Sequence, residues 1–411
     1  MTSDPYRAGR VFVWTWLPDE SSPVVAGAVD RVGADRLDFT YARSYLENEK
    51  AISLYAPELP LRRGVQEPLD GLAVAACLKD STPDSWGERV IDNRLGAGET
   101  ELSIETYMLE SGSNRLGAID FQEGPEDYSP RVDTASLDEL YEAAEKVLAG
   151  EPLDPAIGDA LMNGTAIGGA HPKVLISDDA GIEYIAKLSV STDVHPWIRA
   201  EAVGIELARR CGIQVPNSRV IKSMGRDVLL IERFDRAPGG RRRHVVSGLT
   251  ILGFDALLGA RYGSYPEMLD VLRELGRVPQ EIGRQLFERM VFNIAIGNND
   301  DHARNHAAFW DGRSLELTPA FDLTPQPRST DTSTQAMAIG RDGSRASQFS
   351  VGMAAAADYG LSRPEAKQIV ERIVSNIEDH WSEAADAAGL SEADRNLLWK
   401  RSILNRSTFY A

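Results

Sequence analysis

Cysteine is scarce in this sequence: Cys77 and Cys211 are the only two among 411 residues, and they lie far apart. Such a pair provides neither a disulfide framework nor a cysteine metal site, and it suits a reducing cytosol. No apolar run approaches the length of a membrane span. Residues 1–5 lack the charged-then-apolar pattern of a signal peptide. We therefore expect a cytoplasmic protein with no membrane span.

Positive charge is also in short supply. The chain has 44 Lys and Arg against 62 Asp and Glu, which gives a formal net charge of −18. A broad non-specific grip on nucleic acid is therefore not expected without a basic partner. What is present is the ordinary composition of a globular protein, 43% hydrophobic and 26% charged, at a length that allows two or three domains.

Short sequence patterns divide the chain into three parts. Strand-like stretches at 11–16, 24–29 and 36–41 predict a β-rich start. Residues 123–135 are acidic, contain prolines and have few large apolar side chains, so we place a boundary there. After the Pro-Gly-Gly break at 238–240 the pattern becomes helical, and we predict helices at about 266–275, 280–297, 364–378, 379–388 and 391–403.

The most informative stretch is 296–305, Ile-Gly-Asn-Asn-Asp-Asp-His-Ala-Arg-Asn. In protein kinases a catalytic Asp is followed after four residues by an Asn and, further on, by a metal-binding Asp. Asp300, Asn305 and Asp322 reproduce that order and the first spacing. The His-Arg that usually precedes the base is absent, so this is not an ordinary protein kinase motif. The pattern predicts Asp300 as a base that deprotonates a hydroxyl, with Asn305 and Asp322 as ligands of Mg²⁺.

A lysine and a glutamate upstream complete the pattern. Lys187 lies inside an apolar strand at 182–188, and Glu201 lies near the start of a helix predicted from about 197 to 211. Kinases pair a strand Lys with a helix Glu so that the Lys meets the phosphates of ATP. Two other interpretations remain: a strand Lys often extends to solvent, and an acid suits the first turn of any helix.

A glycine-rich stretch at 164–174 precedes the lysine strand. Glycines let backbone N–H groups approach phosphates without a Cβ clash, although glycine-rich hairpins are common and the stretch alone is weak evidence. The apolar strand at 228–234 ends close to the break at 238–240. In a two-lobed kinase the hinge that faces adenine would lie there.

The order of these motifs resembles the HipA family of bacterial toxin Ser/Thr kinases over most of the chain. The stretches that carry the resemblance are 52–54 with 59–61, 83–87, 167–173, 185–187, 232–236, 298–305 and 317–322. The resemblance implies a two-lobed kinase-like α+β fold. It implies a β-rich N-terminal subdomain over 1–122, an N-lobe with glycine loop, lysine strand and hinge over 123–238, and an all-helical C-lobe over 239–411.

The resemblance also implies a site for ATP and Mg²⁺. Asp300 matches the catalytic base, and Asn305 and Asp322 match the metal ligands. The remaining nucleotide-binding positions are Ile167, Gly168 and Gly169 in the phosphate loop, Lys187, Glu232 and Phe234 at the hinge, and His302, which we expect to orient the catalytic loop. The family has an autophosphorylated serine before the glycine turn. Ala166 stands there in this chain, so Thr165 is the neighbouring hydroxyl that could replace it.

The function implied is that of the toxin in a type II toxin–antitoxin system, a kinase that phosphorylates a cytosolic protein and arrests growth. Known substrates in the family include an aminoacyl-tRNA synthetase. The implied partner is an antitoxin that is a dimeric helix-turn-helix repressor, through which DNA would be reached. The basic run 241–244, Arg-Arg-Arg-His, could meet phosphates or an acidic partner, but such runs are usually solvated loops.

Two other functions fit parts of the same pattern. A metal-dependent hydrolase could use Asp300, Asp301, His302 and His306, because two His four residues apart are a common ligand pair. It lacks the Glu directly after His302 that such enzymes carry. A catalytically silent co-repressor of a helix-turn-helix protein is compatible with the kinase fold, but the predicted catalytic residues are all present.

Overall fold

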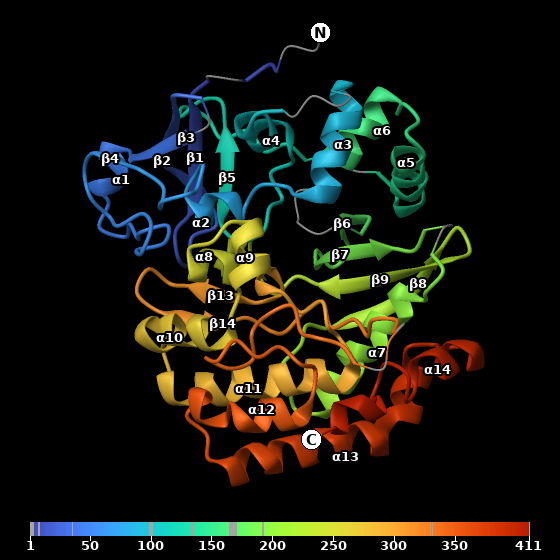
Figure 1. Ribbon diagram of the computed structural model, residues 1–411. Helices are drawn as coiled ribbons and strands as arrows, with labels where there is room; N and C mark the ends of the chain where they lie inside the picture. The colour runs from blue at the N-terminus through green and yellow to red at the C-terminus, as the bar shows by residue number, and fades with distance from the viewer. Residues whose placement is uncertain are drawn as a thin grey trace.

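The computed structural model describes residues 4–6, 9–34, 36–97, 102–132, 135–163, 171–190, 193–328, 330 and 332–410. The chain forms an upper part from its N-terminal third, a small sheet beside it and a large helical lobe below, with the N-terminus at the top and the C-terminus at the bottom (Figure 1). The strands form separate antiparallel sheets beside helices, which confirms the predicted α+β two-lobed fold with an additional β-rich subdomain. The exact domain boundaries stay predictions.

The upper part is organised around a five-stranded antiparallel sheet in the order β4-β3-β2-β1-β5. Its strands are β1 (Val11–Trp16), β2 (Pro23–Val32), β3 (Arg36–Tyr41), β4 (Val65–Gln66) and β5 (Ile119–Gln122). Short helices accompany it: α1 (Arg43–Leu46), α2 (Ala76–Lys79), α3 (Ser85–Leu95) and α4 (Ile104–Glu110). The three predicted strands are confirmed. β5 returns from far along the sequence to close the sheet against β1.

The helix α3 begins at Ser85, and its Trp86 is buried. The Trp86 Nε1 donates to Lys173 O at 3.0 Å, which ties the upper part to the small sheet. Asp84 occupies the N-cap position but does not cap the helix. Its carboxylate forms an ion pair with Arg304 at 3.1 Å instead.

The small sheet is antiparallel in the order β6-β7-β9-β8. Its strands are β6 (Lys173–Ser177), β7 (Glu183–Leu188), β8 (Ser218–Ser223) and β9 (Arg226–Glu232). Side chains alternate along β7: Tyr184, Ala186 and Leu188 enter a core shared with α3, α5 (Leu137–Ala149) and α6 (Pro155–Asn163). The alternate residues, which include Lys187, therefore face the other way, where α7 (Trp197–Arg210) lies.

The large lobe is mostly helical, but the prediction of an all-helical lobe needs correction. Its helices are α8 (Gly248–Leu252), α9 (Ala256–Tyr262), α10 (Tyr265–Leu275), α11 (Pro279–Ile296), α12 (Phe349–Ala354), α13 (Arg363–Ala387) and α14 (Glu392–Leu398). It also contains a three-stranded sheet of β12 (His244–Ser247), β13 (Ala307–Trp310) and β14 (Leu315–Leu317). These strands are too short to show a sequence period. Where two helices were predicted at 364–388, α13 continues without a break.

The upper part also contacts the large lobe directly. The Trp310 Nε1 donates to Ser53 O at 2.8 Å. One carboxylate oxygen of Asp80 accepts from Ser247 N and from the Thr250 hydroxyl, both at 2.7 Å. The upper part therefore touches both lobes. Within the described residues, no helix has the combined length and apolar character that crossing a bilayer requires.

One contact between these parts gives a pH prediction. His244 is buried, its Nε2 lies 3.0 Å from Trp16 O, and burial lowers the pKa of its imidazole from 6.5 to about 4. As the pH falls from about 6.5 to about 4, His244 becomes protonated in the unfolded chain but stays neutral in the folded protein. We expect the stability to fall by up to roughly 3 kcal/mol across this window. Urea unfolding at several pH values would show a flatter profile for H244Q than for the wild type, and equal slopes for the two proteins would contradict this prediction.

Candidate active site

Lys187 on β7 meets two acids that come from distant parts of the chain. Its Nζ donates to both carboxylate oxygens of Glu201 on α7, at 2.8 and 2.7 Å, and to Asp322 Oδ1 at 2.7 Å. The predicted contact between the strand lysine and the helix glutamate is therefore present. Asp322 follows β14, so three separate elements converge on one ammonium group in the interior of the molecule.

Electrostatics keep these groups charged. Burial alone would lower the pKa of Lys187, but Asp322 and Glu201 outweigh it and raise that pKa. Burial would raise the pKa of Asp322, and the attraction and hydrogen bond of Lys187 lower it instead. Burial raises the pKa of Glu201 despite Lys187. Both shifts favour the charged forms, an ammonium on Lys187 and a carboxylate on Asp322.

The backbone of Asp322 is unusual. Its φ of 58° lies in the left-handed region, which Asp and Asn tolerate better than most residues. The Asn298 amide donates both to Asp322 O, at 3.1 Å, and to Asn293 Oδ1, at 2.9 Å. Asn293 belongs to α11, so these amide contacts link the helix, the loop that follows it and Asp322. Rare backbone conformations of this kind concentrate at functional sites.

The loop after α11 is anchored by Asp301. This buried carboxylate accepts from the Tyr265 hydroxyl and from Asn293 Nδ2 at 2.7 Å, and it lies 3.1 Å from His306 Nε2. Asp301 and His306 thus satisfy each other inside the lobe. In the described part of the chain, no three His, Cys, Asp or Glu side chains are grouped to hold a metal ion. The hydrolase arrangement is therefore not supported.

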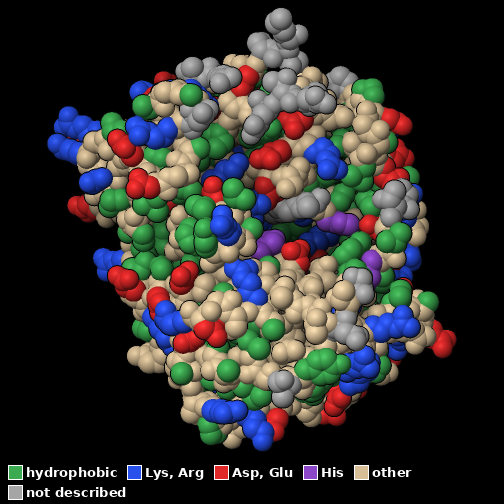
Figure 2. Space-filling view, in the orientation of Figure 1, with side chains coloured by type: hydrophobic (Ala, Val, Ile, Leu, Met, Phe, Trp, Pro, Cys, Tyr) green, Lys and Arg blue, Asp and Glu red, His purple; other side chains and the backbone are tan. Residues whose placement is uncertain are grey.

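Asp300 lies next to this anchor and is exposed to solvent. The Asn305 amide donates to Asp300 O at 3.3 Å, so the two predicted residues are adjacent. Partial desolvation raises the pKa of Asp300, with a further contribution from the Asp322 charge, and His302 opposes the rise. Figure 2 shows histidine and acidic side chains around a hollow at mid-height of the molecule. The structure therefore brings Asp300, His302, Asn305 and Asp322 together.

His302 fits an orienting role. Its backbone N–H donates to Asp300 O at 2.8 Å. Its imidazole is close enough to Asp300 and Asp322 to lower the pKa of both carboxylates. Its Nδ1 is enclosed and has no hydrogen-bond partner among the described residues. That nitrogen is a polar atom at the site that an added ligand or water could satisfy.

The two predicted hinge residues lie at the end of β9. The Glu232 N–H donates to Asn217 O at 2.8 Å. The Phe234 ring packs against Phe309 and Phe321, each with ring centroids 5.8 Å apart. Because Phe321 directly precedes Asp322, the hinge and the segment that carries Asp322 share one aromatic cluster. The glycine-loop residues Ile167, Gly168 and Gly169, and Thr165, lie outside the described residues.

The segment after the hinge is bound to the upper part by buried charges. Asp235 lies between the guanidinium groups of Arg233, at 2.7 Å, and Arg236, at 2.9 Å, and accepts from Gly117 N at 2.7 Å. Both arginines also donate to Asn114 Oδ1 at 2.7 Å. Burial would raise the pKa of Asp235, but the two arginines lower it well below its ordinary value. We call this set of five residues the hinge clamp.

Sequence reasoning missed Lys173 as a site residue. It lies directly opposite Lys187 in the pairing of β6 with β7 and is buried. Burial, followed by the repulsion of Lys187, lowers its pKa to about 8, while Asp84, Asp322 and Glu201 oppose the fall. A second amine therefore borders the same acids. The available signal was its position near the end of the glycine-rich stretch 164–174.

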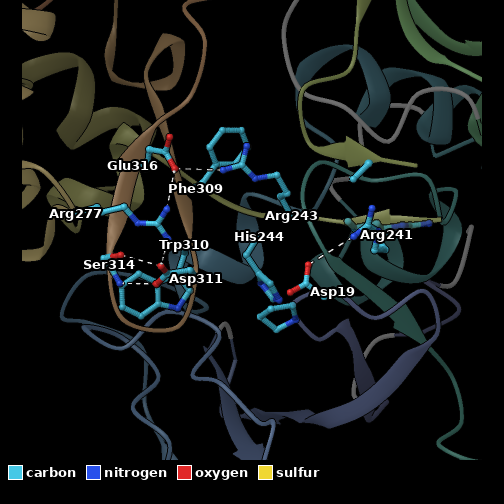
Figure 3. Close-up of a pocket in the computed structure, with 13 residues that line it drawn as sticks. Asp19, Arg241, Arg243, His244, Arg277, Phe309, Trp310, Asp311, Ser314 and Glu316 are labelled. Atoms are coloured by element: carbon cyan, nitrogen blue, oxygen red, sulfur yellow. Dashed lines mark hydrogen bonds and ion pairs between the residues drawn. The ribbon is translucent and has the colours of Figure 1, made fainter. Parts of the chain in front are cut away.

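The basic run 241–244 does not join this site. It borders a separate cavity of about 280 Å³ between the upper part and the β13–β14 hairpin (Figure 3). There the Arg243 guanidinium stacks 3.2 Å from the Phe309 ring centroid and pairs with Glu316 at 3.4 Å. Arg277 pairs with Asp311 at 2.8 Å. The arginines are thus packed and paired, so the expectation of a simple solvated loop is wrong.

The contact between α7 and the Asp322 segment gives a mutational prediction. A Cβ added at Gly204 would lie 1.8 Å from Leu323 O. G204A should therefore lower the free energy of unfolding by about 1–3 kcal/mol and displace Asp322, although alanine alone would favour the helix by about 1 kcal/mol. G352A is the control, because its Cβ would meet Met290 at 3.5 Å, an ordinary contact. Equal urea midpoints for both variants would contradict this prediction.

Comparison with known proteins shows which protein family this chain resembles. Residues 165–381, more than half of it, match the model of the HipA-like C-terminal domain, and residues 21–122 match the HipA N-terminal domain. The chain is 28% identical to the serine/threonine-protein kinase toxin HipA of Shewanella oneidensis over 189 residues, 41% of this chain and 43% of that one. It is 24% identical to the Sinorhizobium fredii protein named "Putative kinase Y4mE" over 378 residues, 85% of this chain and 86% of that one.

A solved structure shows the same fold. HipA from Shewanella oneidensis MR-1, determined in a complex with HipB and its operator DNA, superposes with a TM-score of 0.70 at 19% identity. The match covers 96% of both chains, so the upper part and both lobes correspond. With both domain models matched in order, this chain belongs to the HipA family.

Proposed function

We propose that this chain is an ATP- and Mg²⁺-dependent serine/threonine protein kinase that acts as the toxin of a type II toxin–antitoxin system. The observation that carries the proposal is the contact of Lys187 with Glu201 and Asp322 at 2.7–2.8 Å. This is the arrangement that kinases use to hold the phosphates of ATP. Asp300 and Asn305 lie on the adjoining loop.

In this proposal Asp300 orients the acceptor hydroxyl and takes its proton. Exposure places its carboxylate within reach of an incoming side chain. Partial desolvation raises its pKa, which makes its carboxylate a better base than that of an ordinary aspartate. Lys187 supplies positive charge to the phosphate oxygens, with Lys173 next to it. Catalysis then consists mainly of positioning and charge neutralisation.

Asn305 and Asp322 are chemically suited to Mg²⁺. Carboxylate and amide oxygens are hard donors, and protein sites for Mg²⁺ on nucleotides commonly use only one or two such side chains beside phosphates and water. Lys187 favours the ionised form of Asp322, and the Asn305 amide nitrogen donates within the loop, so the Asn305 Oδ1 would be the atom that holds the metal. When bound, Mg²⁺ would neutralise charge on the phosphates.

The partner in this proposal is a dimeric helix-turn-helix antitoxin that represses transcription and holds the toxin. The Shewanella relative crystallised with HipB and operator DNA supports it. The net charge of −18 supports DNA contact through the partner rather than by this chain alone. The substrate would be a cytosolic protein such as an aminoacyl-tRNA synthetase, whose phosphorylation would arrest growth.

The test combines binding with transfer. Purified chain is incubated with ATP, Mg²⁺ and a bacterial lysate, and phosphoproteins are identified by mass spectrometry, while ATP affinity is measured by calorimetry. New phosphoserine or phosphothreonine that requires the active chain would establish the kinase and name its substrate. ATP binding without transfer to any protein would favour the silent co-repressor. Failure to bind ATP would overturn the proposed chemistry.

A further inference from the structure

His171 borders the candidate active site, two residues before the strand β6 begins. The Leu188 N–H donates to Pro172 O at 2.9 Å, which fastens this end of β6 to β7. Lys173, two residues further on, lies directly opposite Lys187 in the sheet. The imidazole of His171 therefore lies beside the two ammonium groups of the site, and it has no role so far in the proposed mechanism.

One nitrogen of the His171 ring has no hydrogen-bond partner. Its Nε2 is enclosed and makes no hydrogen bond with the residues that the structure describes. The Asp193 Oδ2 lies 3.7 Å from it, which suits an ion pair but is too long for a hydrogen bond. That oxygen accepts from Val190 N at 2.8 Å. An enclosed polar atom that the protein leaves without a partner is a contact point for a ligand or a water.

The charged groups that face this imidazole belong to the site or adjoin it. Burial lowers the pKa of His171, and Asp193 opposes the fall. Lys187 and Lys173 lower that pKa further by repulsion, against the attraction of Asp322. Residues 164–170 and 191–192, which lie outside the described residues, contain no ionisable side chain. This environment favours the neutral imidazole.

Phosphate groups would reverse that balance. In the proposed function the phosphates of ATP lie at Lys187, so their negative charge would offset the repulsion that the two lysines exert on His171. A charge of opposite sign within ~4–6 Å favours the charged form of an ionisable group. In the imidazolium both ring nitrogens are donors. Protonation would therefore give Nε2 a charge-assisted hydrogen bond to a phosphate oxygen, the strongest kind available to this ring.

We propose that His171 is a nucleotide-binding residue that takes up a proton when the phosphates bind and donates from Nε2 to a phosphate oxygen. The inference rests on the proposed kinase function and deepens it, because it makes the affinity for nucleotide depend on pH. The proton comes from solvent, and no covalent bond forms or breaks. Because the bound form holds one proton more than the free form, affinity should rise as the pH falls, by up to about tenfold per pH unit.

The first experiment follows the histidine rings of the full chain by NMR after labelling with ¹³C-histidine. The sequence contains 6 histidines, and the resonance that is missing from H171Q identifies His171. If H171Q does not fold, H171N gives the same assignment. We expect the titration midpoint of His171 to move to higher pH by about one pH unit or more when Mg²⁺ and a non-hydrolysable ATP analogue are added. Adenosine, which has no phosphate, should leave the midpoint in place.

The second experiment counts protons. Calorimetric titration with the same ATP analogue is repeated in two buffers of different ionisation enthalpy, at a pH between the free and bound midpoints. The wild type should take up more protons than H171Q. H380Q, which changes a histidine 3.7 Å from Glu383 on α13, is the matched control and should take up as many as the wild type.

The outcomes separate the inference from the function on which it rests. An unchanged His171 midpoint with the analogue bound, or an equal shift with adenosine, would overturn the inference and leave ATP binding by the chain standing. Equal proton uptake by the wild type and H171Q would overturn it as well. A folded chain that binds no nucleotide at any pH would overturn both the inference and the proposed function.

Discussion

Replacement of Asp300 by Asn should lower the rate of phosphoryl transfer to protein by about 10²–10⁴-fold, the usual contribution of a general base. The amide has nearly the same size but cannot take the proton of the acceptor hydroxyl. Affinity for ATP should stay close to that of the wild type, because Lys187 and Asp322 are unchanged. Transfer rates with labelled ATP and calorimetric titration would measure both quantities.

The pH profile gives a second measurement of the same group. Partial desolvation raises the pKa of Asp300, and only its ionised form can accept a proton. Transfer should therefore decline as the pH falls through this raised pKa, and the decline should be absent from the residual activity of D300N. D379N, an exposed change on α13, is the matched control and should behave as wild type. Full transfer by D300N would remove Asp300 from the mechanism.

The largest loss of stability is expected from D235N, which removes the central charge of the hinge clamp. Asp235 is 2% exposed and pairs with Arg233 and Arg236 while accepting from Gly117. Without its charge, the two buried guanidinium groups keep only the more distant carboxylate of Glu183, 3.5 Å from Arg236 and 3.9 Å from Arg233. Breaking a buried pair in this way costs about 3–5 kcal/mol. Urea unfolding followed by circular dichroism would show a clear fall in the midpoint.

D19N serves as the comparison for that loss. The Asp19 side chain is 93% exposed and lies 3.7 Å from Arg241, so its pair is screened by water. Its removal should change the free energy of unfolding by less than about 1 kcal/mol. If D235N were as stable as D19N, the hinge clamp would contribute orientation rather than stability.

The sequence predicted those site residues that lie close together in the chain. It predicted those elements whose apolar residues recur with a clear helix or strand period. Asp300 and Asn305 lie on one loop, and their separation was readable directly. Lys187 could be placed because alternation along β7 sets the side on which it lies. The glycine-loop positions and the roles of all these residues stay predictions.

Features that depend on distant contacts could not be predicted. The hinge clamp joins Arg233 to Asn114, which lie 119 positions apart in the chain. A pattern of neighbouring residues does not predict such a contact. Lys173 looked like part of a turn motif, because its burial depends on Lys187 and Trp86 from other elements. The strands β12–β14 have only three or four residues each and are stabilised by pairing rather than by sequence pattern.

The hinge clamp has a consequence for how the two lobes move. The upper part grips the hinge through Asn114 and Gly117 and also holds the large lobe through Asp80. The upper part therefore bridges the hinge and the large lobe. If the two lobes moved apart, hydrogen bonds at one of these two contacts would be strained. A partner protein that binds the upper part and shifts it would therefore alter the affinity of the cleft for a nucleotide. By thermodynamic reciprocity, the nucleotide would alter how tightly that protein is held.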